Sequence, residues 1–557
     1  MRRIFFLFAL VIGGSACGDG ATPNRGGLQF EEITARSGIA MRHDAARTAR
    51  KYMPEIMGPG IAALDANGDG NVDLLCLQSG PVPGGESRQT PAVPGISRGP
   101  TLWFGRGDGT FEDVTATRLP VITPYALGVA ASDIDGDGDV DVFVACLGAD
   151  VLLMNRGDGS FEDHTAASGI HDDDYGNAAC WFDADADGDL DLYVVNYVRF
   201  SVKEHRDCGD PAKGRVSYCH PDALPASPDR VWRNLGEGRF EDATKELGFT
   251  ETTGKGLGVV SGDFDMDGSP DVYVANDSTP NFLWTRRANG TWEEVGILHG
   301  CALNEDGRTE AGMGVAVGDV NGDGRWDLFV TNLTREANAL YLGSQSGDFE
   351  YASRTSGLHV ISWRWVGFGC DFVDYDLDGD LDLHVVNGHV VDDSAVTDDT
   401  VPFLQPGQIL SNDGVGRFIE VSARDLGGLG DPGLGRGTAT LDFDNDGRPD
   451  LAVAANDGPV RIFRNTTTTD NAWIGLNLRG GAPNTSAVGA RVTVLANGRL
   501  LMREVRAGGS YASCHDPRLH FGLGAPCTSV EVKVTWPNGT ASSHVLPTNR
   551  YHHILFQ

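Results

Sequence analysis

Seven clusters of aspartates are the residues of this chain best placed to do chemistry. Each cluster follows the nine-residue pattern D-x-[DN]-x-D-G-x-x-D. Ca²⁺ binds six to eight oxygen ligands at about 2.3–2.6 Å. Side chains at positions 1, 3, 5 and 9 and the backbone carbonyl at position 7 can surround one ion, and glycine at position 6 permits the sharp turn. The pattern therefore predicts about seven structural calcium ions, one in each loop.

Each loop is expected to supply four side-chain ligands and one backbone carbonyl. The side-chain ligands are Asp65, Asn67, Asp69 and Asp73; Asp133, Asp135, Asp137 and Asp141; Asp183, Asp185, Asp187 and Asp191; Asp263, Asp265, Asp267 and Asp271; Asp319, Asn321, Asp323 and Asp327; Asp374, Asp376, Asp378 and Asp382; Asp442, Asp444, Asp446 and Asp450. The backbone-carbonyl ligands are those of Asn71, Asp139, Asp189, Ser269, Arg325, Asp380 and Arg448.

Two other interpretations of the loops are weaker. In a solvated acidic turn, three or four neighbouring carboxylates would repel one another strongly without a cation between them. An EF-hand loop would place its last carboxylate at position 12 and lie between helices, whereas these loops end at position 9 between strand-like apolar runs. Both comparisons favour a calcium loop between two strands.

A second motif repeats in step with the loops and fixes the architecture. It is an aromatic residue followed by acids, as in FEDVT from Phe111, and it also occurs seven times. Each unit then contains four antiparallel strands, which is typical of a propeller blade. The first aromatic strand, at Phe30, precedes every acidic loop, and none follows the last loop at Asp442. We therefore predict that the N-terminal strand completes the last blade and closes the ring, which removes exposed sheet edges.

The predicted fold class is all-β with two domains. A seven-bladed propeller is expected over residues 28–466. Residues 471–557 alternate apolar and polar side chains, as in VEVKVTW from Val530, which predicts a small β-sandwich.

Charge excludes one class of partner. The chain has 44 basic and 78 acidic residues, a net charge of −34. Phosphates would be repelled by this balance, so no nucleic acid is expected to bind. Seven Ca²⁺ would add 14 positive charges and reduce the net charge from −34 to −20.

The first 17 residues have the pattern of a signal peptide. Arg2 and Arg3 precede an apolar run, and the stretch that ends at Cys17 resembles a bacterial lipobox. We predict lipidation of Cys17, with ordinary cleavage and secretion as the alternative. The protein is thus expected in the bacterial cell envelope, as an outer membrane lipoprotein, periplasmic or at the surface, or else secreted, with membrane contact only through that lipid. An oxidising compartment permits disulfides, and we expect the pairs Cys208–Cys219 and Cys514–Cys527.

Two known sequence families resemble parts of this chain. The repeat unit is similar to the FG-GAP (VCBS-type) repeat of integrin α-subunit propellers, which carries the same acidic loop. Segments AVGARVTV from Ala487, REVRAGGSYAS from Arg503, LHFGLG from Leu519 and VTWPNG from Val534 resemble the ASPIC/UnbV domain. Together they resemble the cartilage acidic protein-like family. The resemblance implies the fold and the metal but no activity.

Two functions fit the long insertions, which fall near residues 78–100, 197–230 and 388–408, on the face opposite the calcium loops. We favour a binding, adhesion or scaffold module that holds a protein or glycan on that face. The alternative is a polysaccharide lyase or hydrolase with its site at the axial mouth, where the candidate catalytic residues are Lys255, Arg308, Glu310 and His389. Aromatic and charged residues near this mouth could form a ligand site or pack between blades.

Overall fold

The computed structural model describes residues 27–86, 97–210, 212, 214–251, 253–392 and 400–557. Within these residues, seven four-stranded antiparallel sheets form the blades of a propeller. The first blade contains β2 (Ile61–Leu64), β3 (Asp73–Cys76), β4 (Thr101–Gly105) and β5 (Phe111–Asp113). The strands run outward in chain order, and the innermost strands of neighbouring blades contact one another around the ring.

The other blades repeat this order. They are β6 (Ala126–Ser132), β7 (Asp141–Cys146), β8 (Val151–Asn155) and β9 (Phe161–Asp163); β10 (Gly176–Phe182), β11 (Asp191–Asn196), β14 (Arg230–Asn234) and β15 (Phe240–Asp242); β16 (Gly256–Gly262), β17 (Asp271–Asn276), β18 (Phe282–Arg286) and β19 (Trp292–Glu294); β20 (Val315–Gly318), β21 (Asp327–Val330), β22 (Ala339–Gly343) and β23 (Phe349–Tyr351); β24 (Gly367–Val373), β25 (Asp382–Asn387), β26 (Gln408–Asn412) and β27 (Phe418–Glu420); and β28 (Gly435–Leu441), β29 (Asp450–Ala455), β30 (Arg461–Asn465) and β1 (Phe30–Glu32).

The ring closes through the N-terminal strand, as predicted. Strand β1 pairs antiparallel with β30, and Phe30 lies opposite Asn465. The innermost strand β2 of the first blade contacts β28 of the last blade and β6 of the second. Because each blade is packed between two others, second strands such as β7 are buried along their whole length.

Short helices and one hairpin complete the propeller. The α-helices are α1 (Thr34–Ser37), α2 (Thr115–Arg118), α3 (Thr165–Ser168), α4 (Thr244–Leu247) and α5 (Leu358–Ser362), and the 3₁₀ helices are η1 (Met53–Ile56), η3 (Pro221–Ala223) and η4 (Ala423–Asp425). The hairpin of β12 (Cys208–Asp210) and β13 (Arg215–Ser217) lies in the insertion between β11 and β14. A disulfide joins Cys208 to Cys219 at the base of this hairpin.

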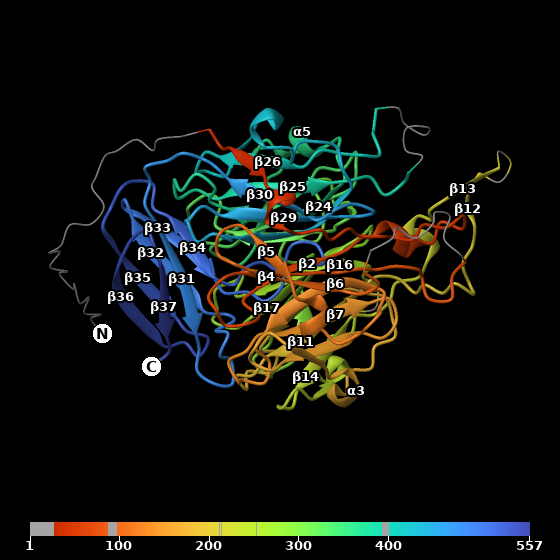
Figure 1. The fold of residues 1–557 in the computed structure, drawn as a ribbon, viewed down its shortest axis with the longest axis horizontal. Helices are drawn as coiled ribbons and strands as arrows, with labels where there is room; N and C mark the ends of the chain where they lie inside the picture. The colour runs from red at the N-terminus through yellow and green to blue at the C-terminus, as the bar shows by residue number, and fades with distance from the viewer. Residues whose placement is uncertain (1–26, 87–96, 211, 213, 252, 393–399) are drawn as a thin grey trace, which may run out of the picture.

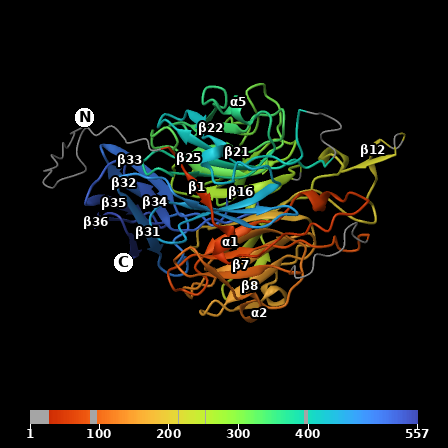
Figure 2. The same cartoon turned by 45° about the horizontal axis from the view of Figure 1, so that its top comes forward.

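The C-terminal domain is a seven-stranded β-sandwich. Strands β33 (Arg499–Glu504), β32 (Arg491–Ala496), β35 (Ser529–Thr535) and β36 (Ala541–Pro547) form one sheet, and β34 (Leu519–Gly522), β31 (Trp473–Arg479) and β37 (Tyr551–Leu555) form the other. The sandwich lies on one side of the propeller and the β12–β13 hairpin on the opposite side (Figure 1, Figure 2).

The connection between β33 and β34 fills the axis of the propeller. We call residues 505–516 the axial plug. Its backbone or side chains hydrogen-bond to the innermost strands β2, β6, β10, β20, β24 and β28. It passes β16 so closely that a Cβ added to Gly258 would lie 3.3 Å from the Ser510 carbonyl oxygen. The side chain of Tyr511 is fully buried in the core. The plug therefore joins the sandwich to all seven blades.

The predicted Cys514–Cys527 disulfide is wrong. Cys514 belongs to the plug, and its buried thiol packs among residues of the first two blades. Cys527 packs against the core of the sandwich instead. The path of the plug into the axis carries the two residues into different cores. Cys17 lies outside the described residues.

Candidate metal centres

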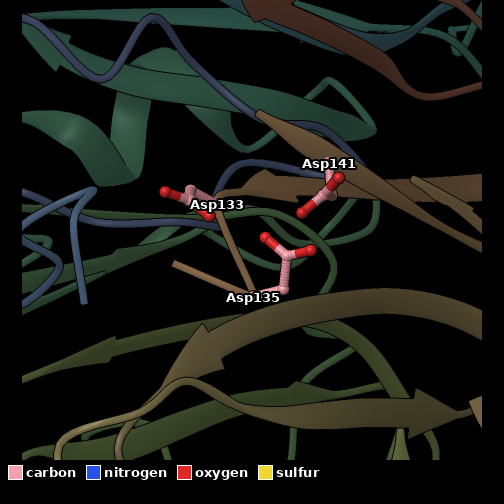
Figure 3. A group of neighbouring side chains, drawn as sticks. All are labelled: Asp133, Asp135 and Asp141. Atoms are coloured by element: carbon pink, nitrogen blue, oxygen red, sulfur yellow. The ribbon is translucent and has the colours of Figure 1, made fainter. Parts of the chain in front are cut away.

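Each acidic loop joins the first and second strands of its blade, and its aspartates converge. In five loops, three carboxylates offer oxygen atoms that all lie within 4.8 Å of one another. Figure 3 shows this arrangement for Asp133, Asp135 and Asp141. The loops that begin at Asp65 and Asp319 carry asparagine at position 3, so fewer carboxylates meet there. Several of the predicted loops can therefore hold a metal ion.

The aspartate at position 1 closes the turn. In all seven loops one of its carboxylate oxygens accepts a hydrogen bond from the backbone N–H of the position-6 glycine. The N···O distance ranges from 2.7 Å at Asp133 to 3.2 Å at Asp263. These glycines have φ between +79° and +100°, which only glycine adopts without strain.

The backbone at position 4 of each loop is also left-handed, a requirement that the sequence pattern does not reveal. Its φ lies between +55° and +80° in every loop. Three loops have glycine there, but the others have Ala186, Met266, Leu377 and Asn445. Of these four, only Asn445 is a residue that tolerates this conformation well. The left-handed requirement at position 4 is not visible in the sequence, because Ala186, Met266 and Leu377 are not typical turn formers.

The aspartate at position 9 fixes the loop to the blade. In Asp141, Oδ2 accepts a hydrogen bond from the N–H of Ile134 at 3.2 Å, and Oδ1 accepts one from Asn155 at the end of β8 at 2.8 Å. Burial raises the pKa of Asp141 to about 8 despite these bonds. The same cause raises the pKa of Asp73 and Asp191 to about 8. A bound cation would instead favour the ionised form of these carboxyl groups.

The donor set fits a hard divalent cation. Asp185, Asp263 and Asp444 each keep one buried carboxylate oxygen without a hydrogen-bond partner in the part of the chain that is described. These residues occupy positions 1 or 3, where ligands are expected. Carboxylate, amide and carbonyl oxygens are the ligands that Ca²⁺ prefers.

The sandwich covers these loops to different extents. Arg479 donates a hydrogen bond to the Gly138 carbonyl at 2.8 Å in the second loop. Tyr551 donates its hydroxyl to Asp442 Oδ2 at 2.9 Å in the seventh loop. The calcium-loop face is therefore largely an interface between domains.

On the opposite face, the insertions meet around residues 47–55. Arg50 forms an ion pair with Asp207 of the hairpin insertion at 2.9 Å, and Lys51 pairs with Asp392 of the third insertion. Arg47 donates a hydrogen bond to the hydroxyl of Tyr218 at 2.9 Å. Two insertions that are far apart in the sequence are thus joined by the segment that leads into the first blade.

The four candidate catalytic residues have separate environments. Lys255 donates to Asp222 at 3.1 Å, and Arg308 is exposed. Glu310 accepts hydrogen bonds from Asn304 at 3.1 Å and Asn332 at 3.2 Å. Its pKa is raised to about 7 by burial. His389 is buried, and its ring nitrogen Nδ1 lies 3.0 Å from the N–H of Val391.

Several aromatic and charged residues of the axial mouth pack against one another. Tyr125 and Tyr175 are buried in one cluster with Tyr511. Arg436 is fully buried, stacks 3.9 Å above the Phe368 ring, and has its pKa lowered to about 9 by burial. Exposed groups remain at the rim, including Trp363, which is 45% exposed. Packing therefore accounts for Tyr125, Tyr175 and Arg436, and the exposed groups at the rim remain candidates for a ligand site.

Comparison with known sequence families defines the class of this protein. The FG-GAP-like repeat matches residues 65–144, 133–194, 221–274, 263–330 and 319–385, more than half of the chain. The FG-GAP repeat matches residues 434–471, and the ASPIC and UnbV family matches residues 480–555. The chain belongs to the family of FG-GAP repeat propellers that carry a C-terminal ASPIC/UnbV domain.

Individual relatives support this assignment. Cartilage acidic protein 1 of Homo sapiens is 26% identical over 344 residues, which cover 60% of this chain and 49% of that protein. The Mus musculus protein is 26% identical over 349 residues, with 60% and 50% coverage. The chain thus spans about half the length of these curated relatives.

Among solved structures, the BP39L lectin of Burkholderia pseudomallei has a TM-score of 0.44 at 12% identity, covering 74% of this chain and 99% of the lectin. YCF48 bound to D1 peptide has a TM-score of 0.40 at 11% identity, covering 80% and 97%. Among the described residues of our chain, no helix is both long and apolar enough to cross a bilayer.

Proposed function

We propose that this chain is an exported calcium-binding propeller that serves as a binding or scaffold module. The observation that carries the proposal is the convergence of three carboxylates in five of the acidic loops. The same loop pattern occurs seven times, so up to seven Ca²⁺ ions are expected. Their role is structural, because the ligands lie in turns that join the first two strands of the blades.

Metal analysis tests the calcium assignment directly. The purified full chain is equilibrated with Ca²⁺, freed of unbound ion and analysed by mass spectrometry for metal content. We expect about seven ions per chain, and Mg²⁺ should not displace them because it demands a smaller octahedral shell. Fewer than five ions, the number of loops with three converging carboxylates, would contradict the assignment.

Export is supported by two features of the chain. The Cys208–Cys219 disulfide is typical of an oxidising compartment. Exported proteins meet calcium near the millimolar range, about 100 times a dissociation constant of roughly 10 μM, and each acidic loop would then be stabilised by about 2.7 kcal/mol. Cell fractionation with labelled lipid precursor tests export and lipidation of Cys17 together, with Cys17→Ala as the control.

A protein or glycan partner is proposed at the insertion-bearing face. The sandwich occupies much of the calcium-loop face, whereas the opposite rim keeps exposed aromatic and cationic groups. Arg364 stacks over the Trp365 ring at 5.2 Å, beside the exposed Trp363. Such pairs are suited to sugar rings or to protein side chains.

Binding screens test this face. Glycan arrays and pull-downs from envelope extracts would use the calcium-loaded chain and the Trp363→Ala variant. We expect the variant to lose binding, while truncation of an exposed apolar side chain on the sandwich, Val545→Ala, has no effect. Equal binding by all three proteins would refute the assignment of this face.

A further inference from the structure

Two acidic loops have the same aspartates but very different surroundings. The third loop (residues 183–191) and the sixth loop (residues 374–382) both carry aspartate at positions 1, 3, 5, 7 and 9. In the third loop the position-5 side chain, Asp187, is exposed. In the sixth loop all five aspartates are between 2% and 7% exposed. A difference in burial at constant composition must come from what lies on top of the loop.

The sandwich is what covers the sixth loop. The N–H of Gly524 donates to the Leu377 carbonyl at 2.9 Å, and Asn471 Nδ2 donates to the Asp376 carbonyl at 3.3 Å. Gly522 of β34 lies against the loop so closely that an added Cβ would be 2.2 Å from Asp374 Oδ2. Leu501 lies on the other side, 3.7 Å from the position of a Cβ on Gly379.

Charge at this interface favours a further cation. Five carboxylates bring five negative charges into the buried loop. Arg499 forms an ion pair with Asp380, and Arg503 lines the same 160 Å³ interdomain cavity as Asp374. A Ca²⁺ ion would add two positive charges to those of the arginines and would favour the ionised form of the loop carboxyl groups. Because burying ionised carboxylates is costly and a bound cation lowers that cost, docking of the sandwich and cation binding in this loop favour each other.

We propose that the sixth loop holds an occluded Ca²⁺ ion that the sandwich seals between the two domains. The ion exchanges only when the sandwich moves away, and its presence stabilises the docked sandwich. The sandwich also approaches the third loop, where Pro483 lies beside Gly188, but it leaves Asp187 exposed, so the ion of that loop exchanges freely. This inference rests on the proposed calcium binding and adds a distinct role for one of the sites.

Release kinetics provide the first test. The full chain is loaded with Ca²⁺, its metal content is measured, and it is then mixed rapidly with an excess of a fluorescent chelator. We expect one ion per chain to leave at least about ten-fold more slowly than the rapidly released ions, because the interface must open first. Asp378→Asn should abolish the slow phase. The matched variant Asp187→Asn, at position 5 of the third loop, should reduce only the fast amplitude.

A variant that changes only the cover provides the second test. Gly522→Ala is compatible with the local backbone, since φ of Gly522 is not left-handed, but its Cβ would collide with Asp374 and Leu377. We expect the slow ion to leave about ten-fold faster in this variant. Gly433→Ala is the control, because nothing lies within 4 Å of its added Cβ. If Gly522→Ala fails to fold, Arg499→Ala loosens the same cover by removing the ion pair with Asp380.

The outcomes of these experiments distinguish a failure of calcium binding from a failure of occlusion at the sixth loop. Fewer than five bound ions at equilibrium would overturn calcium binding and the inference with it. A full complement of ions released in one fast phase would overturn occlusion alone. So would a slow phase that survives Asp378→Asn, because the slow ion would then belong to another loop.

Discussion

Replacing Tyr511 with alanine is expected to destabilise the whole molecule by about 4 kcal/mol, because truncating a buried aromatic side chain costs about 3–5 kcal/mol. Tyr511 is fully buried on the axis of the propeller. Its ring meets that of Phe368 edge-on at 4.8 Å, and its hydroxyl donates to the Met57 carbonyl at 3.1 Å. Tyr511→Phe keeps the ring and removes only the hydroxyl, which also lies 3.5 Å from Asn177 Oδ1, so it should cost about 1 kcal/mol.

Urea unfolding at saturating Ca²⁺, followed by tryptophan fluorescence, measures both costs. Trp363→Ala serves as the control, since this side chain is 45% exposed and its loss should change stability by less than about 0.5 kcal/mol. Because Tyr511 lies in the plug that anchors the sandwich to the propeller, its truncation should also make the sandwich more susceptible to proteolysis than the propeller. An alanine variant as stable as the wild type, or a phenylalanine variant as damaged as the alanine one, would refute the role of the plug.

Three further predictions concern the metal, the turns and one buried acid. Chelation with EGTA should lower the melting temperature markedly, since each site at 100-fold calcium excess contributes about 2.7 kcal/mol; an unchanged calorimetric curve would show that the ions are not structural. The backbone φ is left-handed at both Ala186 and Gly188. Ala186→Gly should therefore leave the free energy of unfolding unchanged or raise it by up to about 1 kcal/mol, whereas Gly188→Ala should lower it by about 1–2 kcal/mol. Chemical denaturation measures both changes, and equal effects would contradict the loop geometry. Glu310 has its pKa raised from 4.5 to about 7 by burial. The contribution of Glu310 to the free energy of unfolding is therefore full below pH 4.5 and is lost as the pH rises through 7. Between pH 4.5 and pH 8, the wild type should lose about 3 kcal/mol of stability relative to Glu310→Gln. Parallel curves of stability against pH for the two proteins would refute this assignment.

The propeller could be predicted from the sequence because its signals are local and repeated. The offset between the aromatic motif at Phe30 and the acidic loop at Asp442 predicted the closure that β1 and β30 make. The loop pattern likewise predicted which carboxylates converge, since positions 1, 3 and 9 meet in four of the five clusters. In the sixth loop the three that meet are Asp374, Asp376 and Asp378. Short-range geometry is enough to specify such a turn.

The interface between the domains could not be predicted in the same way, because it depends on contacts between residues far apart in the sequence. The predicted Cys514–Cys527 pair failed for this reason: Cys514 follows the plug into the core of the first two blades. One signal was present in the run Gly508–Gly509. Both residues have φ near +140°, and a Cβ on Gly508 would lie 2.6 Å from Cys180 Cβ. Two adjacent glycines within an otherwise strand-like segment indicate such close approach of the backbone.

The plug and the acidic loops give the two faces of the propeller different roles. Docking of the sandwich places Arg479, Arg499 and Tyr551 against loop atoms, so much of the calcium-loop face is already occupied by the chain itself. The seven loops carry 29 aspartates, which account for much of the net charge of −34. Arginines of the sandwich offset part of their repulsion, and the calcium ions that we propose would offset more of it inside the molecule. The insertion-bearing face keeps its exposed aromatic and charged groups, and a partner is therefore expected there.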